Sequence, residues 1–150
     1  MSGTGTSSLT RVIDAGKGLV ACFKQYHGYP SGYGLQLGEF LASGKVTHGI
    51  PQPVGTLAGS DAMKVHFHDA GCLAAQMIAR FKVAAGGYYV EHYDVKDVAQ
   101  KYEYEVNISK HGDITLICYL CTRSSGFQLH VVFAGSVNQF INFCKSGVYR

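Results

Sequence analysis

The residues best suited to bind or transform a ligand lie in one segment, Gln25–Gly34, which reads QYHGYPSGYG. Its glycines permit positive φ angles and close approach of the backbone to a ligand, and Pro30 stiffens its centre. An apolar run precedes the segment and a helical pattern follows it, which predicts a strand-to-helix loop. Unpaired amides at a helix start favour an anion. The rings of Tyr26, Tyr29 and Tyr33 can flank a flat group such as a base.

Histidines could add acid–base chemistry to this loop, and His27 is the first candidate and His48 the second. No catalytic residue is assigned, because the seven histidines are scattered. The spacing fits neither GxxxxGK[ST] nor GxGxxG, so no ATPase or dinucleotide-binding assignment follows. The alternative interpretation is a tight turn whose tyrosines pack on the core. The predicted ligand-binding residues are Gln25, Tyr26, His27, Gly28, Tyr29, Pro30, Ser31, Gly32, Tyr33, Gly34 and His48.

A second group that could do chemistry is His66-Phe67-His68-Asp69. On a strand, the HxH spacing puts both imidazoles on one face, as a metal site would need, and Asp69 or Cys72 could add a ligand. No second cluster completes a metal-binding pattern, so loop packing is the preferred interpretation. We therefore expect no metal and no cofactor.

Two further pairs are given structural interpretations. Glu103 and Glu105 share one face of a predicted strand, where a solvated face or a subunit contact is favoured over a carboxylate pair. Cys118 and Cys121 form a CxxC inside the strand-like run ITLICYLC, so their side chains point to opposite sides and do not share a metal or a disulfide. The odd count of five cysteines, without a secretory signal, predicts reduced thiols and a cytoplasmic protein.

Composition narrows the possible partners. Charged residues make up only 15% of the chain, well below the usual quarter, so we expect a surface that meets a partner and forms a homo-oligomer. The net charge of +3, without a run of Lys or Arg, argues against extended nucleic acid. No apolar run approaches the ~20 residues of a membrane span. Residues 1–10 are expected to be a flexible leader and residues 11–150 a single domain.

Periodicity and turn residues place these groups on an α+β fold. We predict an antiparallel sheet of about five to six strands, with two to three helices packed on one face. The predicted strands are Arg11–Asp14, Leu19–Tyr26, Tyr88–Tyr93, Lys101–Ser109, Ile114–Thr122 and Phe127–Phe133, the last four forming a meander. The predicted helices are Gly34–Ala42, His68–Val83 and Val137–Cys144. The Gly- and Pro-rich segment 44–61 is expected to fold over the site.

Several of these stretches together resemble a known group of proteins. QYHGYPSGYGLQLGEFL, followed by VTHGI, GCLAAQMIARFK, GGYYV and KYEYEV, is similar to small phage, prophage and bacterial proteins of uncharacterised function with a Q-Y-D-G-Y-P-S-G-H-G-like motif. The similarity covers about residues 22–108. This chain has His27 where the motif has Asp, and Tyr33 where it has His. An acid–base pair is thereby missing, which favours recognition over catalysis.

The loop chemistry and the resemblance together predict a phage-type protein that binds and sequesters a small anionic, nucleotide-derived signalling molecule, as in evasion of bacterial defence. A small hydrolase or nuclease acting on such a molecule is one alternative, with His27, His48 and the pair His66/His68 supplying acid–base or metal chemistry. A protein-interaction accessory that docks through its Tyr-rich strands is the other. A binding protein is favoured over an enzyme.

Overall fold

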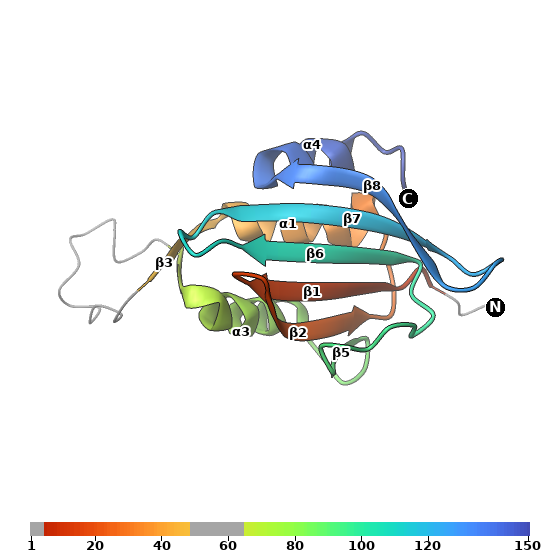
Figure 1. Ribbon diagram of the computed structural model, residues 1–150, viewed down its shortest axis with the longest axis horizontal. Helices are drawn as coiled ribbons and strands as arrows, with labels where there is room; N and C mark the ends of the chain where they lie inside the picture. The colour runs from red at the N-terminus through yellow and green to blue at the C-terminus, as the bar shows by residue number, and fades with distance from the viewer. Residues whose placement is uncertain (1–4, 49–64) are drawn as a thin grey trace.

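The structure is a computed structural model that describes residues 5–48 and 65–150. Its centre is a six-stranded sheet in the order β5-β2-β1-β6-β7-β8. The strands are β1 (Ser8–Asp14), β2 (Lys17–Lys24), β5 (Tyr88–Glu91), β6 (Tyr102–Ile108), β7 (Ile114–Thr122) and β8 (Gln128–Ser136). Figure 1 shows this sheet face-on with the helices behind it.

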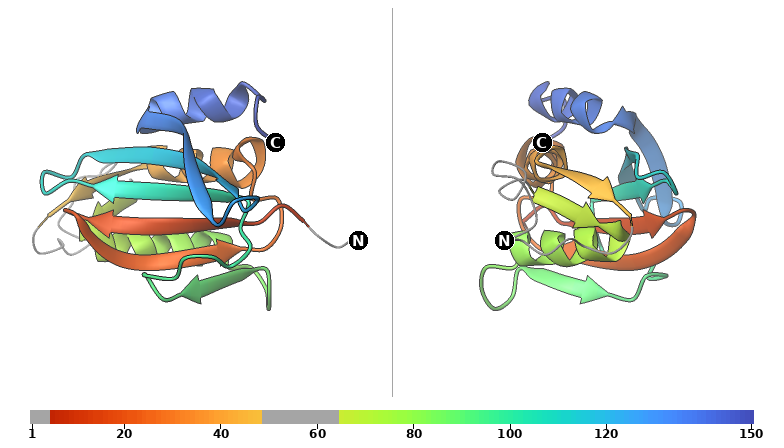
Figure 2. Two further views of the ribbon diagram at one scale, coloured as in Figure 1. Left: turned by 45° about the vertical axis from the view of Figure 1, so that its right-hand side comes forward. Right: turned by 90° about the vertical axis from the view of Figure 1, so that its left-hand side faces the viewer.

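Three helices in the described chain lie on one face of the sheet: α1 (Leu35–Ala42), α3 (Asp69–Phe81) and α4 (Val137–Lys145). Figure 2 shows all three on the same side, so none of the described helices covers the opposite face. A small parallel pair, β3 (Gly44–Thr47) and β4 (Val65–His68), lies beside them. The predicted class, an α+β fold with helices on one face, is confirmed.

The strand arrangement differs from the predicted antiparallel sheet in two places. β1 runs parallel to β6, and β5 pairs with β2 at the far edge instead of opening the meander. The hairpin β1–β2 and the meander β6–β7–β8 are each antiparallel because short turns connect their strands. A long connection separates those two units, so no turn dictates the relative direction of β1 and β6. The sheet is therefore mixed, although mostly antiparallel.

Alternation along β6 divides its side chains between the two faces as predicted. Tyr102, Tyr104, Val106 and Ile108 are buried and belong to the core between sheet and helices. The intervening side chains point to the open face, but Glu103 is only 2% exposed there. The predicted solvated face is thus wrong at Glu103, because the chain between β5 and β6 covers it.

The predicted leader is too long at its C-terminal end. Residues Ser8–Thr10 form the start of β1 and are buried, because β1 pairs with β2 on one side and β6 on the other. Residues 1–4, and most of the segment predicted to fold over the site, lie outside the described residues. The part that is described, 44–48, includes strand β3, which the sequence patterns did not predict.

The predicted helix ends and cysteine positions agree with the structure. Ser136 accepts a hydrogen bond from the amide of Gln139, whose side chain in turn accepts one from the amide of Ser136, which completes a capping box at α4. Cys118 and Cys121 are both buried and free. Cys118 is part of the core against the helices, while Cys121 pairs with Leu129 at the far end of β7.

Candidate functional site

The loop Gln25–Gly34 joins β2 to α1, as predicted, but backbone hydrogen bonds within the loop occupy several of its amides. Residues Pro30–Gly34 form one π-helical turn that runs directly into α1. The amide of Gly32 donates to the carbonyl of Tyr29 over 3.0 Å, and that of Gly34 to the same carbonyl over 3.3 Å. The amide of Tyr33 donates to the carbonyl of His27 over 2.9 Å. The expectation that these amides are free for an anion is therefore wrong, because the turn uses them itself.

The glycine at position 28 serves close packing. Its amide donates to the carbonyl of Thr6 over 2.7 Å, and its carbonyl accepts the hydroxyl of Tyr104 over 2.7 Å. A Cβ added to Gly28 would lie 2.7 Å from the backbone nitrogen of Ser8. A side chain at this position would push the loop away from β1, so Gly28 is explained by the fold alone.

The three tyrosines of the loop have different environments. Tyr33 is 1% exposed, accepts the hydroxyl of Thr10 over 3.1 Å and is hydrogen-bonded to the hydroxyl of Tyr88 over 3.1 Å. Burial raises the pKa of the Tyr33 phenol, so it remains neutral. Tyr29 is half-buried, whereas Tyr26 is 42% exposed. Tyr26 is therefore the most exposed of the three tyrosines and the one that a ligand can reach most readily.

His27, the first candidate for a base, is exposed and has a φ angle of 58°, which is uncommon for a non-glycine residue. Its Nδ1 lies 3.2 Å from the hydroxyl of Tyr29. That hydroxyl is a neutral partner, so the contact gives His27 no carboxylate to orient it as a base. The arrangement favours a recognition role for His27.

A pocket lies beside this loop, at the C-terminal end of β2. It has a volume of about 430 Å³. One wall consists of Lys24, Gln25 and Tyr26, and the other of the α3–β5 connection with Phe81 and Tyr88. Lys82 shapes this second wall, since its ammonium donates to the carbonyls of Gly86 over 3.0 Å and Tyr88 over 2.9 Å. The two walls are joined where the amide of Gln25 donates to the carbonyl of Gly87 over 2.9 Å.

Lys24 is the charged side chain of this pocket. Its ammonium lies 5.9 Å from the centroid of the Tyr33 ring, and partial burial lowers the pKa of the amine. None of the described residues that line the pocket is acidic. The pocket therefore combines one partly desolvated cation, one accessible aromatic ring and the amide side chain of Gln25.

The sequence patterns missed Lys24 and the α3–β5 connection. Lys24 falls inside the predicted strand Leu19–Tyr26 and is given no role of its own there, and Gly86-Gly87 is interpreted only as the end of a helix. Both glycines have positive φ angles, 75° and 77°. Only the pairing of β5 with β2 brings this connection opposite Lys24. No local signal marks that contact.

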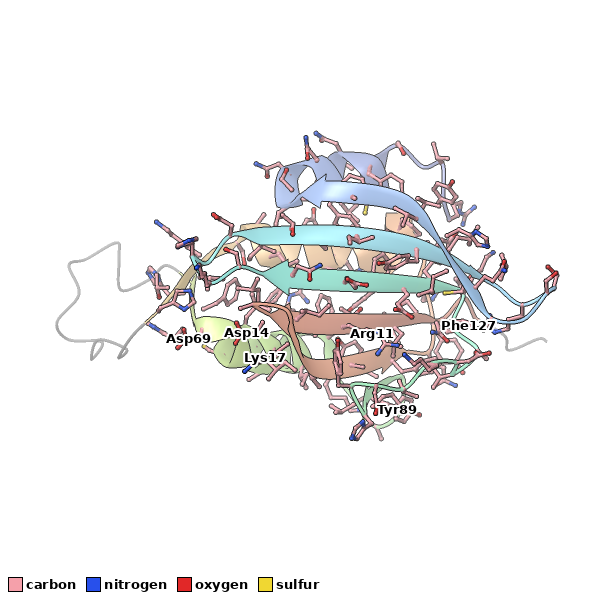
Figure 3. The ribbon with its side chains drawn as sticks, viewed as in Figure 1. Arg11, Asp14, Lys17, Asp69, Tyr89 and Phe127 are labelled. Atoms are coloured by element: carbon pink, nitrogen blue, oxygen red, sulfur yellow. The ribbon has the colours of Figure 1, made fainter. Side chains whose placement is uncertain are left out.

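His48 does not join the other predicted site residues. It follows β3, and its Nδ1 contacts Oδ1 of Asp69 at the start of α3. Figure 3 shows Asp69 at the same end of the sheet as Lys17, where β2 begins, whereas Gln25 follows the other end of β2. The eight residues of β2 separate the two ends by roughly 20 Å. His48 and the loop thus belong to different regions.

His66 and His68 lie on a strand, β4, that the sequence patterns did not predict, and their rings are 6.3 Å apart between centroids. Nδ1 of His68 lies 3.4 Å from the hydroxyl of Thr47 on β3. Within the described ranges, no three His, Cys, Asp or Glu side chains are grouped as a metal site would require. None of the described helices is long and apolar enough to cross a membrane.

Comparisons with known proteins found no relative for this chain. No protein-family model matches it, no curated protein matches it, and no solved structure matches it. Its function is therefore argued from the chemistry of its own surface.

Proposed function

We propose that this protein binds and holds a small anionic, nucleotide-like molecule in the pocket between Lys24–Tyr26 and the α3–β5 connection. The observation that carries the proposal is the ammonium of Lys24, a partly buried cation in a pocket whose lining contains no acid. Binding without turnover is favoured because no oriented acid–base pair lines this pocket.

The charge of Lys24 favours an anion. Moving an ammonium out of water is unfavourable unless an opposite charge or hydrogen-bond acceptors compensate for it. A phosphate or phosphodiester oxygen would supply that charge and form a charge-assisted hydrogen bond. Among the lining residues that the structure describes, Lys24 is the only charged one, so a ligand with one or two negative charges suits the pocket best.

The remaining lining favours a flat group on the same ligand. Tyr26 offers an exposed ring on which a base can stack, and the side chain of Gln25 can both donate to and accept from its edge. A volume of about 430 Å³ lies within the usual range for small-molecule sites. A mononucleotide or a cyclic mononucleotide meets all three requirements.

The resemblance to phage and prophage proteins supports a biological setting for this binding. A phage-encoded binder in the cytoplasm of the host cell would remove a nucleotide signal that bacterial defence depends on. Homo-oligomerisation belongs to the same proposal: the exposed apolar side chains of Tyr26 and Val83, 42% and 88% exposed at the pocket, are suited to contact a second copy.

Calorimetric titration with AMP, cyclic AMP and uncharged adenosine tests the proposal. We expect saturable binding of at least one of the two phosphates and weak or no binding of adenosine. Lys24→Met should weaken phosphate binding about tenfold or more, the effect of losing one charge-assisted contact. Lys17→Met is the matched control, because Lys17 is exposed at the opposite end of the same strand and should leave affinity unchanged.

Recovery of the ligand separates binding from turnover. Nucleotide released by heat from the complex should be chemically unchanged on chromatography. Equal affinity of wild type and Lys24→Met, or no phosphate-dependent binding by the wild type, would show the proposal to be wrong.

A hydrolase is the second candidate, favoured by the contact between His48 and Asp69. A carboxylate on Nδ1 orients an imidazole so that Nε2 can carry a proton. Asp69 also has a φ angle of 67°, a strained conformation of the kind that occurs at functional sites. Product formation from the same nucleotides in the presence of a chelator, lost in His48→Ala but not in His92→Ala, would favour this candidate. His92 is a suitable control because it forms a similar exposed pair with Asp94.

A further inference from the structure

The open face of the sheet, which none of the described helices covers, carries a separate group of polar and apolar side chains. Arg11 on β1, Glu103 and Glu105 on β6, and Leu129 on β8 line a cavity of about 250 Å³ there. Its walls are completed by the β5–β6 connection and by Phe127. Figure 3 shows Arg11 and Phe127 on this open face.

Two of the three ions at the base of the cavity neutralise each other. Nε of Arg11 donates to Oε2 of Glu103 over 3.0 Å, and their side chains are 11% and 2% exposed. The other oxygen of Glu103 accepts from the side chain of Gln100 over 3.1 Å. The remaining nitrogens of Arg11 donate to the carbonyls of Tyr93 and Val95. This network is complete, and it secures the β5–β6 connection to the sheet.

Glu105, two residues along β6, is in a different situation. Its carboxylate accepts the hydroxyl of Tyr119 over 2.8 Å and the amide of Asn107 over 3.4 Å, both of them neutral donors. Burial, followed by the hydrogen bond to Glu105, raises the pKa of the Tyr119 phenol, so that phenol remains a donor. Across the described ranges, no Lys, Arg or His forms an ion pair with Glu105.

The charges around the cavity leave one negative charge without a partner. Within the described part of the chain, the lining contains two cations, Arg11 and Lys96, and three carboxylates, those of Asp94, Glu103 and Glu105. Its net charge is therefore −1. The rest of the lining is apolar or aromatic and consists of Ile13, Tyr93, Phe127 and Leu129.

We propose that this cavity binds a small organic monocation, an alkylammonium or alkylguanidinium ion. The cationic head donates to the free lone pairs of Glu105 in a charge-assisted hydrogen bond. The hydrocarbon part packs against Ile13, Phe127 and Leu129, which removes apolar surface from water. The volume restricts the ligand to a chain of a few carbons, and the complete network of Arg11 leaves Glu105 as the acceptor.

The test uses two monocations, n-butylammonium and n-butylguanidinium, as probes, with 1-butanol as the uncharged analogue. Chemical-shift titration of the wild type should give saturable binding of both cations with shifts on β6 and β8, and no binding of 1-butanol. Glu105→Gln should reduce cation affinity about tenfold or more. Glu91→Gln is the matched control, since Glu91 lies on the edge strand β5 and does not line the cavity.

A second variant keeps the test decisive if Glu105→Gln alters the sheet. Leu129 is 40% exposed, so Leu129→Lys should fold, and its own ammonium should reach Glu105 and compete with the probes. Loss of cation binding in both variants supports the proposal. It is overturned if neither probe binds at up to about 10 mM, or if both variants bind as tightly as the wild type.

This inference does not rest on the proposed nucleotide pocket. The side chain of Lys24 packs toward the helix-covered face, near Tyr33, whereas Glu105 is on the open face. Lys24→Met should therefore leave cation binding unchanged. A failure of anion binding and a failure of cation binding can be told apart in the same protein preparations.

Discussion

The two faces of the sheet satisfy their buried polar groups in different ways. On the helix-covered face, the groups near the loop are hydroxyls: Thr10, Tyr33 and Tyr88 hydrogen-bond to one another without any ion. On the open face, Arg11 and Glu103 are ions, each with several partners. The helices exclude water over a wide area, where a charge would be costly. Beneath a single covering segment, a buried ion pair can be accommodated when each of its oxygens and nitrogens has a hydrogen-bond partner.

The comparison also shows where unpaired charge occurs. Lys24 lies at the edge of the area that the helices cover on one face of the sheet. Glu105 lies at the edge of the area that the β5–β6 connection covers on the other face. At these margins a side chain is partly desolvated but can still be reached by a ligand. Both candidate binding sites are therefore consequences of incomplete cover, and the following variants test the two faces against each other.

The largest change in the free energy of unfolding is expected for a substitution on the helix-covered face. Tyr33→Ala should lower the free energy of unfolding by about 4 kcal/mol, because it removes a buried ring and leaves a cavity. The ring of Tyr33 packs against those of Phe81, Tyr88 and Tyr104, with centroids 5.0, 6.2 and 5.9 Å away. Urea denaturation measures the change. A loss below about 2 kcal/mol would mean that this ring is not a central part of the core.

On the open face, Arg11→Met should lower the free energy of unfolding by about 3 kcal/mol, since it leaves the carboxylate of Glu103 buried without its ionic partner. The double variant Arg11→Met/Glu103→Gln should recover part of this loss, because the unpaired charge is then absent. Denaturation of all four proteins of the cycle gives the coupling energy. Additive losses would contradict the ion-pair assignment.

The charge of Lys24 should have a smaller effect on the free energy of unfolding, and this effect should depend on pH. Its pKa is lowered in the folded state, so in the range between the folded and unfolded pKa the unfolded chain binds more protons. The stability of the wild type therefore rises as pH increases through the folded pKa of Lys24. Because the side chain is only partly buried and solvent screens its charge, the gain should stay below about 1 kcal/mol. The difference between wild type and Lys24→Met, measured by denaturation from pH 7 to pH 10, should show this rise in the wild type only.

The five cysteines should differ in how fast they react with a thiol reagent, and this test needs no variant that alters stability. Burial raises the pKa of Cys22 to about 11, and that of Cys121 and of Cys144 to about 12. Cys118 is also buried, whereas Cys72 is half-buried on α3. A thiol reagent at pH 8 should modify Cys72 first, and the other four should react only after unfolding. Rapid reaction of either Cys118 or Cys121 would show that one face of β7 opens readily.

Local patterns were sufficient for most elements of the fold. Alternation in YEYEVNI and the spacing of Val137, Phe140, Ile141 and Cys144 predicted β6 and α4, because strand and helix periods are set by the backbone itself. The capping box at Ser136 and the opposite orientation of Cys118 and Cys121 follow from the same local geometry. The position of the loop between a strand and a helix was predicted for the same reason.

The site was predicted only in part. Gln25 and Tyr26 line the pocket, but Tyr33 is a core residue and His48 lies at the other end of the sheet. Glycines in a sequence indicate that a backbone can bend. They do not indicate whether its amides are free. Here the π-helical turn uses the amides of Gly32 and Gly34, and the amide of Gly28 donates to the carbonyl of Thr6, just before β1.

The sequence by itself determined the periods, the turns and the composition of the loop, all of which depend on residues close together in the chain. The tertiary structure alone decided that β5 pairs with β2, which places the α3–β5 connection opposite Lys24. It also decided that β1 lies parallel to β6, which brings Arg11 to Glu103 and leaves Glu105 without an ionic partner in the described chain. Contacts between distant segments decide which charges are paired, and unpaired charges are what a ligand can recognise.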